Sequence, residues 1–407
     1  MNLLFITVSA PYGKRESHLI QELCVIKKSG VNFTILPRDR HSPLFHKKGS
    51  YLKENVMGLP MFELNELFGI FVFSCKNFGR LFWIIFKIIA GSGSFMKILK
   101  NIYILPYALR IAFILNDSRP KHVHAYWGST IATLGYCIAE LINVPWSFTV
   151  HRWEIIENNM LKIKAESACM VRVISQYGVN EMDKIVGECN KKKIRLIRLG
   201  VEIPAIENEQ LKNRFKNWDN EGRIFHIACP AYLLPNKGHV YLIDALFEIK
   251  RGGKLLFKCV FYGEGPLKRS LQSQVRRKGL IKEVIFHDTI PNEELLSLYR
   301  RSDIDIVVLP SLSEGIPVAL MEAMANGVPV IATAVGGVGE LLTGEAGVLI
   351  ESGNPALLAQ AIVKLAKDRS YTERTIFNGY DKVRNDFSDK INAKIFLESL
   401  TGSTLTA

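Results

Sequence analysis

The sequence predicts an α/β protein built from two Rossmann-like units, each a parallel sheet covered by helices. The main observation is a strand–loop–helix alternation that runs along most of the chain and is interrupted by a polar stretch at residues 202–222. The length of 407 residues fits two or three domains. With 48% apolar and 22% charged residues, the chain has the composition of a globular protein with a large core, not of a disordered one.

In the first unit, short apolar runs alternate with helical patterns. The run at residues 3–8 has no positive charge ahead of it, so we expect a buried strand there and not a signal peptide. Further strands are expected at 31–36, 122–124, 146–150 and 194–199, and helices at 17–28 and 130–141.

The polar stretch at residues 202–222 has few apolar anchors and is expected to be a linker. A second alternating unit follows it. Strands are expected at 224–228, 258–262, 284–287, 304–309 and 330–332, and helices at 239–250, 266–278, 292–301, 317–326, 355–367 and 371–400. Parallel sheets of this kind bind ligands beyond the carboxyl ends of their strands.

Charge is distributed unevenly along the chain. The formal net charge is +12 over residues 1–205 and +1 over residues 206–407. A basic first half favours a polyanionic partner, which is a nucleic acid, an anionic membrane or an anionic acceptor; a chance excess that only aids solubility is the alternative. The seven cysteines lie far apart without a CxxC pair, which argues against a disulfide framework or a zinc site and fits a reducing compartment.

Residues 66–115 depart from the alternating pattern because they are unusually apolar and aromatic. A membrane span needs about 20 residues with few charges, whereas this stretch includes Lys76, Arg80 and Lys87. On one helix these three would lie within about 40° of each other. A cationic stripe beside Phe and Trp favours a helix lying in a membrane interface. The alternative is a helix pair packed on the sheet with its basic edge in solvent.

The most informative segment is LPSLSEGIPVALMEAMANGVPVIATAVGGVGELL at residues 309–342. Glu314 stands on a loop after a strand, and Glu322 follows eight residues later on the next helix, whose first turn contains Pro317. A carboxylate such as Glu322 can accept two hydrogen bonds from the vicinal diol of a ribose. The N–H groups ahead of the helix can hold an anion, and they belong to Gly315, Ile316 and Val318.

This segment resembles the E-x7-E signature of retaining nucleotide-sugar glycosyltransferases, specifically glycosyltransferase family 4. The resemblance implies the GT-B fold, in which two Rossmann-like domains face each other across a cleft. It also implies a nucleotide-diphosphate sugar as donor and no obligatory metal. Glu322 would contact the ribose, and Glu314 with residues 315–318 would hold the sugar and the phosphate, with Glu314 required for turnover. Asp303-x-Asp305, a metal motif of another transferase fold, is interpreted as structural.

Two further blocks resemble the donor side of this family. Lys237 in CPAYLLPNKGHVYLIDAL matches a Lys that clamps the diphosphate with an Arg, and the Arg position is Tyr232 here. A tyrosine donates one hydrogen bond but brings no charge. In FYGEGPLKRSL, Gly263 belongs to the turn near which the nucleotide base stacks. The leaving diphosphate would then be stabilised by Lys237 and by N–H groups at the helix terminus.

The stretch HVHAYWGSTIATLGYCIAELINVPWSFTVHRWEII at 122–156 resembles the acceptor side, closest to members that build bacterial surface polysaccharides. His151 matches a His that contacts the donor sugar, and it is followed three residues later by Glu154, where an Asp is usual. His124 is expected to support His151. The first loop, with Gly13 and Lys14, is expected to select the acceptor.

The resemblance implies an acceptor-binding domain at 1–204, a nucleotide-sugar-binding domain at 205–375 and a closing helix at 376–407 that returns to the first domain. The expected reaction moves a sugar to a glycan or lipid-linked acceptor in bacterial polysaccharide or lipopolysaccharide synthesis, at the inner face of the cytoplasmic membrane. An anionic membrane surface could be met by residues 66–115. A catalytically silent membrane-associated scaffold and a nucleotide-sugar epimerase remain alternatives.

Two other classes are disfavoured. No G-x-G-x-x-G follows the first strand, which argues against a dinucleotide oxidoreductase. The basic residues accompany no recognisable nucleic-acid-binding module, so nucleic acid is not an expected partner.

Overall fold

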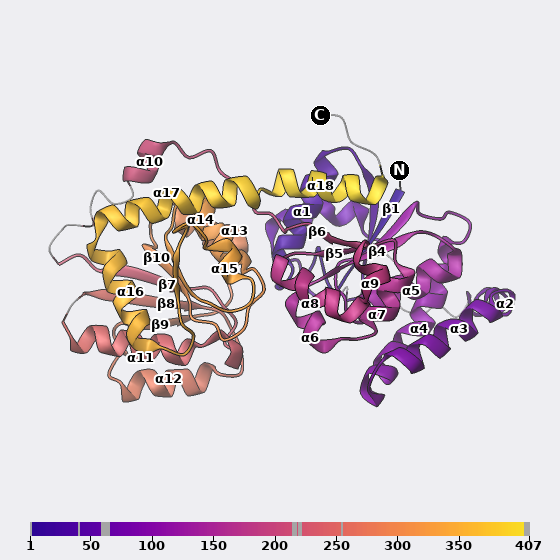
Figure 1. Cartoon of the computed structure of the whole chain (residues 1–407), viewed down its shortest axis with the longest axis horizontal. Coiled ribbons are helices and arrows are strands. Elements are labelled where there is room, and N and C mark those ends of the chain that lie inside the picture. The colour runs from indigo at the N-terminus through magenta and orange to yellow at the C-terminus, as the bar shows by residue number, and fades with distance from the viewer. Residues whose placement is uncertain are drawn as a thin grey trace. The chain divides into compact units, whose positions relative to one another are not determined.

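In the computed structural model, the chain forms two compact units (Figure 1). The first contains Met1–Arg198 and Asn392–Ala407, and the second contains Leu199–Ile391. The structure describes residues 2–39, 41–57, 66–213, 218, 222–253 and 255–402. The seven cysteines are unpaired.

The first unit is built on a six-stranded parallel sheet with the order β2-β1-β3-β4-β5-β6. The strands are β1 (Asn2–Thr7), β2 (Asn32–Pro37), β3 (His122–Ala125), β4 (Trp146–Val150), β5 (Met170–Val173) and β6 (Ile194–Leu196). The chain places β2 on one side of β1 and β3 on the other, so the winding reverses between β1 and β3. Sheets of this kind bind ligands at such a reversal, at the carboxyl ends of the strands.

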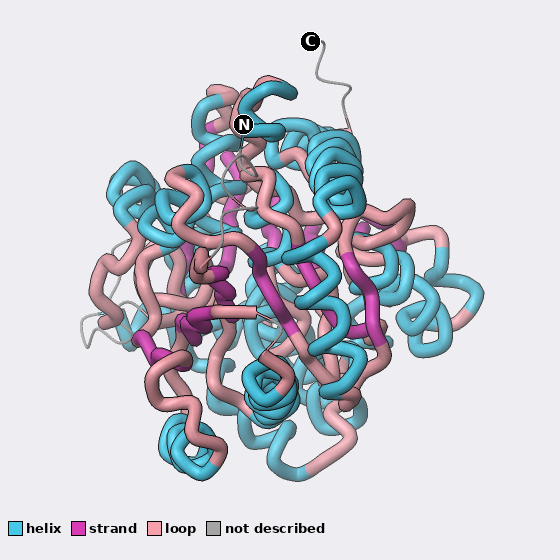
Figure 2. Tube along the Cα trace, turned by 90° about the vertical axis from the view of Figure 1, so that its left-hand side faces the viewer, coloured by secondary structure: helices cyan, strands magenta, loops and turns pink. Residues whose placement is uncertain are grey.

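Helices cover both faces of this sheet. Successive side chains of a strand point to opposite faces, and both faces here carry apolar side chains that the helices bury. From β1, Leu4 and Ile6 enter one core, whereas Leu3 and Phe5 enter the other. The helices are α1 (Ser17–Lys28), η1 (Lys47–Asn55), α5 (Thr130–Ile142), α6 (Arg152–Glu157), α7 (Leu161–Ser167), α8 (Gln176–Val186), α9 (Glu188–Lys191) and α18 (Asp389–Thr401). Phe396 and Leu397 of α18 pack with α1, so the last helix returns to the first unit, as the resemblance implied. Figure 2 shows the strands in magenta flanked by the helices in cyan.

The second unit has its own six-stranded parallel sheet, in the order β12-β11-β10-β7-β8-β9. The strands are β7 (Phe225–Cys229), β8 (Phe257–Tyr262), β9 (Val284–His287), β10 (Ile306–Leu309), β11 (Val330–Thr333) and β12 (Val348–Ile350). The helices are α10 (Asn208–Asn213), η3 (Pro235–Lys237), α11 (His239–Arg251), α12 (Lys268–Arg277), α13 (Asn292–Arg300), α14 (Val318–Ala325), α15 (Val338–Leu341), α16 (Pro355–Lys367) and α17 (Arg369–Asp386). Here the winding reverses between β7 and β10.

Two expectations about the joining segments are wrong. The stretch expected to be a linker contains α10, whose Leu211 is buried against Ile376 and Tyr380 of α17. The helix expected at 371–400 is two helices, α17 and α18. The break between them has a backbone cause, since Val201 donates a hydrogen bond to the carbonyl of Phe387 and its own carbonyl accepts one from Asp389.

Residues 66–115 form three helices, α2 (Leu67–Lys76), α3 (Phe78–Gly91) and α4 (Phe95–Leu115). The axes of α2 and α3 are bent by 86° at Asn77, whose side-chain amide donates to the carbonyl of Phe73. The single helix with a stripe of Lys76, Arg80 and Lys87 is therefore wrong. Arg80 instead donates to the backbone carbonyl of Leu141 at 3.0 Å.

These three helices leave many large apolar side chains exposed. The exposed residues, called the apolar surface below, are Leu67, Phe68, Phe71, Phe78, Phe82, Trp83, Phe86, Ile89, Phe95, Met96, Leu99 and Tyr103. Residues 67–115 contain six basic side chains and no acidic one. By length and composition, α4 is apolar enough to cross a membrane. The bent α2–α3 pair also meets this criterion if it is treated as one span. Half of the apolar window of α4, however, is buried inside the protein.

Candidate active site

At the winding reversal of the second sheet, the loops after β7 and β10 are joined closely. Leu312 donates to the carbonyl of Asn236 at 2.8 Å. Gly238 has φ +67°, and a Cβ there would lie 1.9 Å from the carbonyl oxygen of Pro310. Only glycine allows this approach. The result is a fixed frame for the side chains of Lys237 and Glu314.

Lys237 and Glu314 form an ion pair in this frame. Lys237 Nζ donates to Glu314 Oε1 at 2.5 Å, and Ser311 Oγ donates to the same oxygen at 2.9 Å. The two side chains are 21% and 12% exposed, so the pair is only partly screened by water. Sequence reasoning placed both residues in the site, and the structure brings them together. A diphosphate approaching Lys237 would compete with the carboxylate of Glu314.

The helix α14 begins at Val318, four residues after Glu314. Pro317 is its N-cap and not a first-turn residue, and no side chain caps the first turn. Ile316 and Pro317 are buried, whereas Gly315 and Val318 are half-buried. The first N–H groups of a helix have no partner within the helix and carry partial positive charge. This terminus therefore suits an anion beside Lys237.

Glu322 lies further along α14 and is half-buried. Its Oε1 accepts a hydrogen bond from the side-chain amide of Asn292, the first residue of α13, at 2.7 Å. Asn292 was not singled out from the sequence. The contact orients the carboxylate, because an amide donor occupies one of its two oxygens.

Tyr232 and Gly263 lie on neighbouring loops of the same unit. A Cβ at Gly263 would stand 2.1 Å from the carbonyl oxygen of Ala231, so this glycine is required for close backbone packing. Tyr232 is half-buried on the loop after β7. Leu233 then donates to the carbonyl of Glu264 at 3.0 Å, which joins the two loops.

The pair Asp303 and Asp305 is engaged in contacts within the protein. Asp305 is 4% exposed and accepts from Arg223 at 2.5 Å and from the backbone N–H of His226 at 2.7 Å. Asp303 pairs with Arg301 at 2.8 Å. These contacts support the structural interpretation. In the described part of the chain, no three His, Cys, Asp or Glu side chains are grouped so that they could hold a metal ion.

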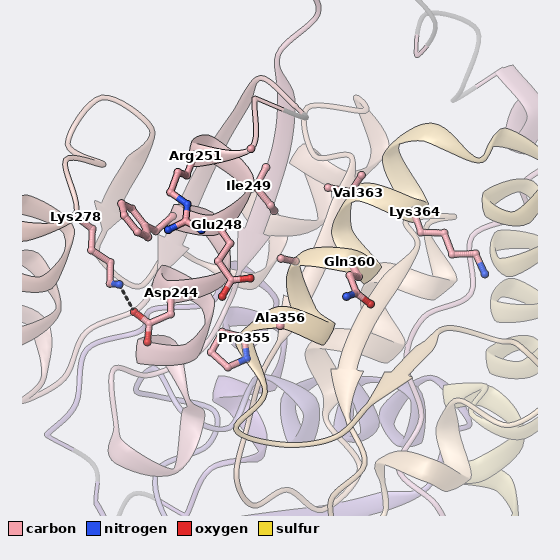
Figure 3. Close-up of a pocket in the computed structure, with 13 residues that line it drawn as sticks. Asp244, Glu248, Ile249, Arg251, Lys278, Pro355, Ala356, Gln360, Val363 and Lys364 are labelled. Carbon is pink, nitrogen blue, oxygen red and sulfur yellow. Dashed lines mark ion pairs between the residues drawn. The ribbon is translucent and has the colours of Figure 1, made fainter.

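A separate pocket of about 790 Å³ lies on the second unit between α11 and α16 (Figure 3). Asp244 and Lys278 form an ion pair of 3.0 Å at its edge, and Glu248 is exposed on its wall. None of the residues predicted for the donor lines this pocket. Its exposed residues are therefore suitable positions for control substitutions.

The winding reversal of the first sheet is organised by Glu16. Its carboxylate accepts from the backbone N–H groups of Val8, Ser9 and Ala10 at 3.2, 2.5 and 2.7 Å. It also accepts from the indole N–H of Trp127, which follows β3, at 2.5 Å. One buried carboxylate thus fixes the loops after β1 and β3. Sequence reasoning missed Glu16 and Trp127.

His151 follows β4 and stacks on Trp127, with ring centroids 4.4 Å apart and planes inclined by 27°. Its Nε2 has no hydrogen-bond partner among the described residues. The ring centroid of His18 lies 6.2 Å away, and burial, followed by the charges of His151 and Arg172, lowers the pKa of His18 to about 3. His18 is therefore neutral at physiological pH.

Glu154 caps the helix that follows His151. Its Oε2 accepts from the backbone N–H of His151 at 2.8 Å and lies 3.4 Å from Nδ1 of the ring. Burial raises the pKa of Glu154, but the hydrogen bonds and charge of His151 outweigh it, so the pKa is lowered. With 3% exposure the carboxylate faces His151 and not solvent.

His124 is fully buried between strands. Its Nδ1 and Nε2 contact Ser147 Oγ at 2.7 Å and Thr149 Oγ1 at 2.9 Å. Burial, with the charges of Arg172 and His122, lowers its pKa well below the ordinary value. His124 thus contacts, through both ring nitrogens, the strand that leads to His151.

Gly13 and Lys14 lie on the first loop. Gly13 has φ +73°, a backbone conformation that favours glycine. Its N–H donates to the carbonyl of Pro43 at 2.9 Å. The ammonium of the exposed Lys14 lies 5.4 Å from the centroid of the Phe45 ring. These residues stand on the same loop that Glu16 fixes.

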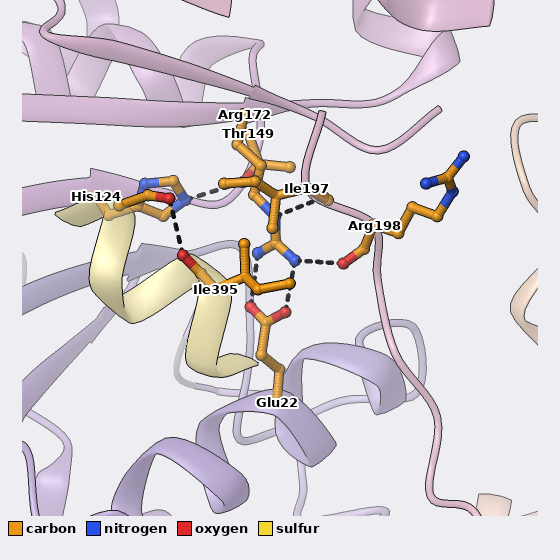
Figure 4. Close-up of polar contacts among 8 residues, drawn as sticks. Glu22, His124, Thr149, Arg172, Ile197, Arg198 and Ile395 are labelled. Carbon is orange, nitrogen blue, oxygen red and sulfur yellow. Dashed lines mark hydrogen bonds and ion pairs between the residues drawn. The ribbon is translucent and has the colours of Figure 1, made fainter. Parts of the chain in front are cut away.

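A buried ion pair lies beneath this site (Figure 4). Arg172 of β5 donates to both carboxylate oxygens of Glu22 of α1, at 2.8 and 2.7 Å. It also donates to the carbonyls of Ile197 and Arg198 at 3.0 and 3.1 Å. The guanidinium lies 4.2 Å from the ring centroid of Phe396. Arg172 therefore joins β5, α1 and α18 in one core.

Residues 210–382 match the family model described as "Glycosyl transferases group 1". This range includes Tyr232, Lys237, Glu314 and Glu322. Over this range, which is less than half of the 407 residues, the chain is similar to that family. The match supports a retaining, nucleotide-sugar-dependent glycosyltransferase of family 4.

Among the relatives of this chain is TuaC of Bacillus subtilis, named for teichuronic acid biosynthesis. It is 25% identical, and the match covers 97% of this chain and 96% of TuaC. WcaL of Salmonella typhimurium, named for colanic acid biosynthesis, is 29% identical, but the match covers 50% of this chain and 49% of WcaL. The chain is therefore related to enzymes named for bacterial surface polysaccharide synthesis.

Solved structures show the same fold. The Anabaena protein HepE, in complex with UDP and glucose, has a TM-score of 0.72 and 17% identity, and the match covers 99% of this chain and all of HepE. The lipopolysaccharide outer core galactosyltransferase WaaB has a TM-score of 0.65 and 14% identity, with 99% of both chains covered. The fold of this glycosyltransferase is therefore GT-B.

Proposed function

We propose that this glycosyltransferase moves a sugar from a UDP-sugar to a hydroxyl of a glycan or lipid-linked acceptor in bacterial surface polysaccharide synthesis. The observation that carries the proposal is the pairing of Lys237 with Glu314 at the winding reversal of the second sheet. UDP as the nucleotide is supported by HepE, which has this fold and was solved with UDP-glucose. The relation to TuaC and WcaL supports the polysaccharide role.

In the proposed donor site each group has a distinct task. Glu322, oriented by Asn292, accepts the ribose hydroxyls. The β-phosphate displaces the carboxylate of Glu314 from Lys237, and the N–H groups at the start of α14 contribute a second positive region. Glu314 is then free to accept from the hydroxyls of the donor sugar. Tyr232 supplies one hydrogen bond where the family has a charge.

The proposed chemical step needs no covalent intermediate on the protein. The bond from the anomeric carbon to the phosphate oxygen breaks, and a bond from the same face of this carbon to the acceptor oxygen forms. The acceptor proton passes to the leaving phosphate. Lys237 and the terminus of α14 stabilise the charge on the departing diphosphate. We propose His151, held by Trp127 and Glu154, as the first-unit group that contacts the reacting sugar.

The test is nucleotide binding measured by thermal stability and calorimetry without added metal. UDP is expected to stabilise the protein, whereas GDP, ADP and CMP should not. Glu322→Ala should weaken UDP binding about tenfold or more, and Glu314→Ala should mainly abolish turnover. The matched control is Glu248→Ala, on the exposed wall of the pocket in Figure 3. Weakening by Glu248→Ala but not by Glu322→Ala would refute the assignment of the donor site.

We further infer that the enzyme lies peripherally at the inner face of the cytoplasmic membrane, through the apolar surface of α2–α4. The support is the exposure of this surface together with the absence of acidic residues between 67 and 115. Sedimentation with phosphatidylcholine vesicles, with or without phosphatidylglycerol, tests it. Phe82→Ser with Phe86→Ser should release the protein from the anionic vesicles, and Ile281→Ser, at an exposed position of the second unit, should not. Unchanged binding of the double variant would contradict the inference.

A further inference from the structure

The first unit contains a pocket of about 880 Å³ that no predicted site residue lines. Three of its wall segments follow the strands β2, β3 and β4 of the first sheet. Arg38 comes directly after β2, Ser129 and Thr130 lie after β3, and Trp153 lies after β4. The pocket therefore opens at the carboxyl edge of the sheet, the same edge that presents His151.

The remaining wall is the exposed side of α4. Leu99 and Tyr103 line the pocket, and Phe95 precedes them at the same four-residue spacing. The spacing places the three side chains in one row along the helix. They are 71%, 47% and 71% exposed in the order Phe95, Leu99 and Tyr103. These three residues of the apolar surface thus form a row that ends in the wall of the pocket.

The pocket also carries positive charge. Arg38 Nη1 donates to Thr130 Oγ1 at 3.1 Å, which fixes the guanidinium at the wall, and Lys100 is exposed on α4 beside it. Glu157 is the one acidic residue of the lining. Two cations next to an apolar row suit a ligand that has an anionic group and a hydrocarbon chain in one molecule.

We propose that this pocket binds the phosphate-bearing end of a lipid-linked acceptor, with the hydrocarbon chain along Phe95, Leu99 and Tyr103. Arg38 and Lys100 contact the phosphate, and Trp153 covers the first part of the chain. The inference rests on the proposed function for its role in transfer, but binding of the amphiphile is separate from binding of the nucleotide. The sequence favoured either a lipid-linked or an anionic acceptor. This pocket favours a lipid-linked acceptor that carries a phosphate.

The test uses farnesyl phosphate below its micelle concentration, with inorganic phosphate and farnesol as the two partial ligands, measured by calorimetry on the full chain. Farnesyl phosphate should bind at least about tenfold more tightly than either partial ligand. Lys100→Glu and Tyr103→Ser should each weaken it about tenfold, because one removes a charge and the other interrupts the apolar row. Lys100→Ala, a milder change at an exposed position, should weaken it less.

The matched controls are Lys121→Glu, at an exposed position ahead of β3 and so at the opposite edge of the sheet, and Ile281→Ser. Neither should change the affinity. Equal binding of farnesyl phosphate and inorganic phosphate, or unchanged affinity in Lys100→Glu and Tyr103→Ser, would overturn the proposal. UDP binding measured on the same variants separates the two proposals. If UDP fails to bind while farnesyl phosphate does, the donor assignment fails and the pocket assignment stands; the reverse result overturns the pocket alone.

Discussion

Replacing Glu22 by Gln tests whether the buried ion pair of the first unit determines its stability. The side chain of Arg172 is 0% exposed and that of Glu22 is 4% exposed. The guanidinium makes four hydrogen bonds, two to the carboxylate of Glu22 and two to the carbonyls of Ile197 and Arg198. In Glu22→Gln the geometry is nearly preserved, but the charge of Arg172 is no longer balanced.

The expected loss follows from the burial of both partners. Removing one member of a buried pair leaves an unpaired charge in a low-dielectric interior and costs about 3–5 kcal/mol. Replacing both members by apolar residues is often neutral, so Glu22→Leu with Arg172→Met should lose less than Glu22→Gln alone. The double variant also gives up the contact with the Phe396 ring at 4.2 Å, which is worth up to about 2 kcal/mol when desolvated. A domain has only about 5–15 kcal/mol in total, so the single change should be severe.

Urea unfolding followed by tryptophan fluorescence measures this difference. Four of the five tryptophans lie in the first unit, at positions 83, 127, 146 and 153. The control is Glu181→Gln, which breaks the exposed pair with Lys184 and should leave the midpoint unchanged. A loss below about 1 kcal/mol for Glu22→Gln, or a double variant that is less stable than the single one, would refute the reasoning.

Three other changes should have measurable effects. Burial lowers the pKa of Lys164 from 10.5 to about 7. Between these pH values the unfolded chain binds more protons than the folded one, so the free energy of unfolding should rise with pH. Lys164→Met should remove this rise, measured by urea titrations at pH 7 and 9. Tyr232→Arg should tighten UDP binding measured by calorimetry, and unchanged affinity would mean that position 232 does not meet the phosphates. Glu16→Gln should speed amide hydrogen exchange at Ser9 and Ala10, because an amide group cannot accept all the bonds of the carboxylate; unchanged exchange would contradict this role.

The strands that the sequence predicted well are continuous apolar runs. Parallel strands are buried on both faces, so β1 and β10 are recognisable without knowledge of their neighbours. The strand β5 was missed because its four residues include Arg172. This arginine is buried only because Glu22, 150 positions earlier, pairs with it. A local pattern contains no information about such a partner.

The same distinction separates the two candidate sites. Glu314, the N-terminus of α14 and Glu322 lie within one loop and helix, so their spacing alone predicted how they would be placed. Glu16 and Trp127 are 111 positions apart, and each alone resembles an ordinary loop residue. Their relation exists only because the sheet places the loops after β1 and β3 side by side. Sequence reasoning therefore grouped the residues proposed for the donor and missed the contacts that join the loops of the first sheet.

The error at residues 66–115 changes what the apolar surface means. The sequence predicted one helix with a polar stripe, but the side chain of Asn77 takes the carbonyl of Phe73 and the chain turns there. On α3, Ile84 and Ile88 are buried in the core, whereas Phe78, Phe82 and Phe86 are exposed at four-residue spacing. This helix is thus apolar on its outer side as well as on its inner side. Apart from Arg80 and Lys87, the helix is apolar on all sides, and a helix of that kind is normally covered by other apolar groups. The surrounding segment carries six cations and no acidic residue, which supports the proposal of an anionic lipid surface as the cover.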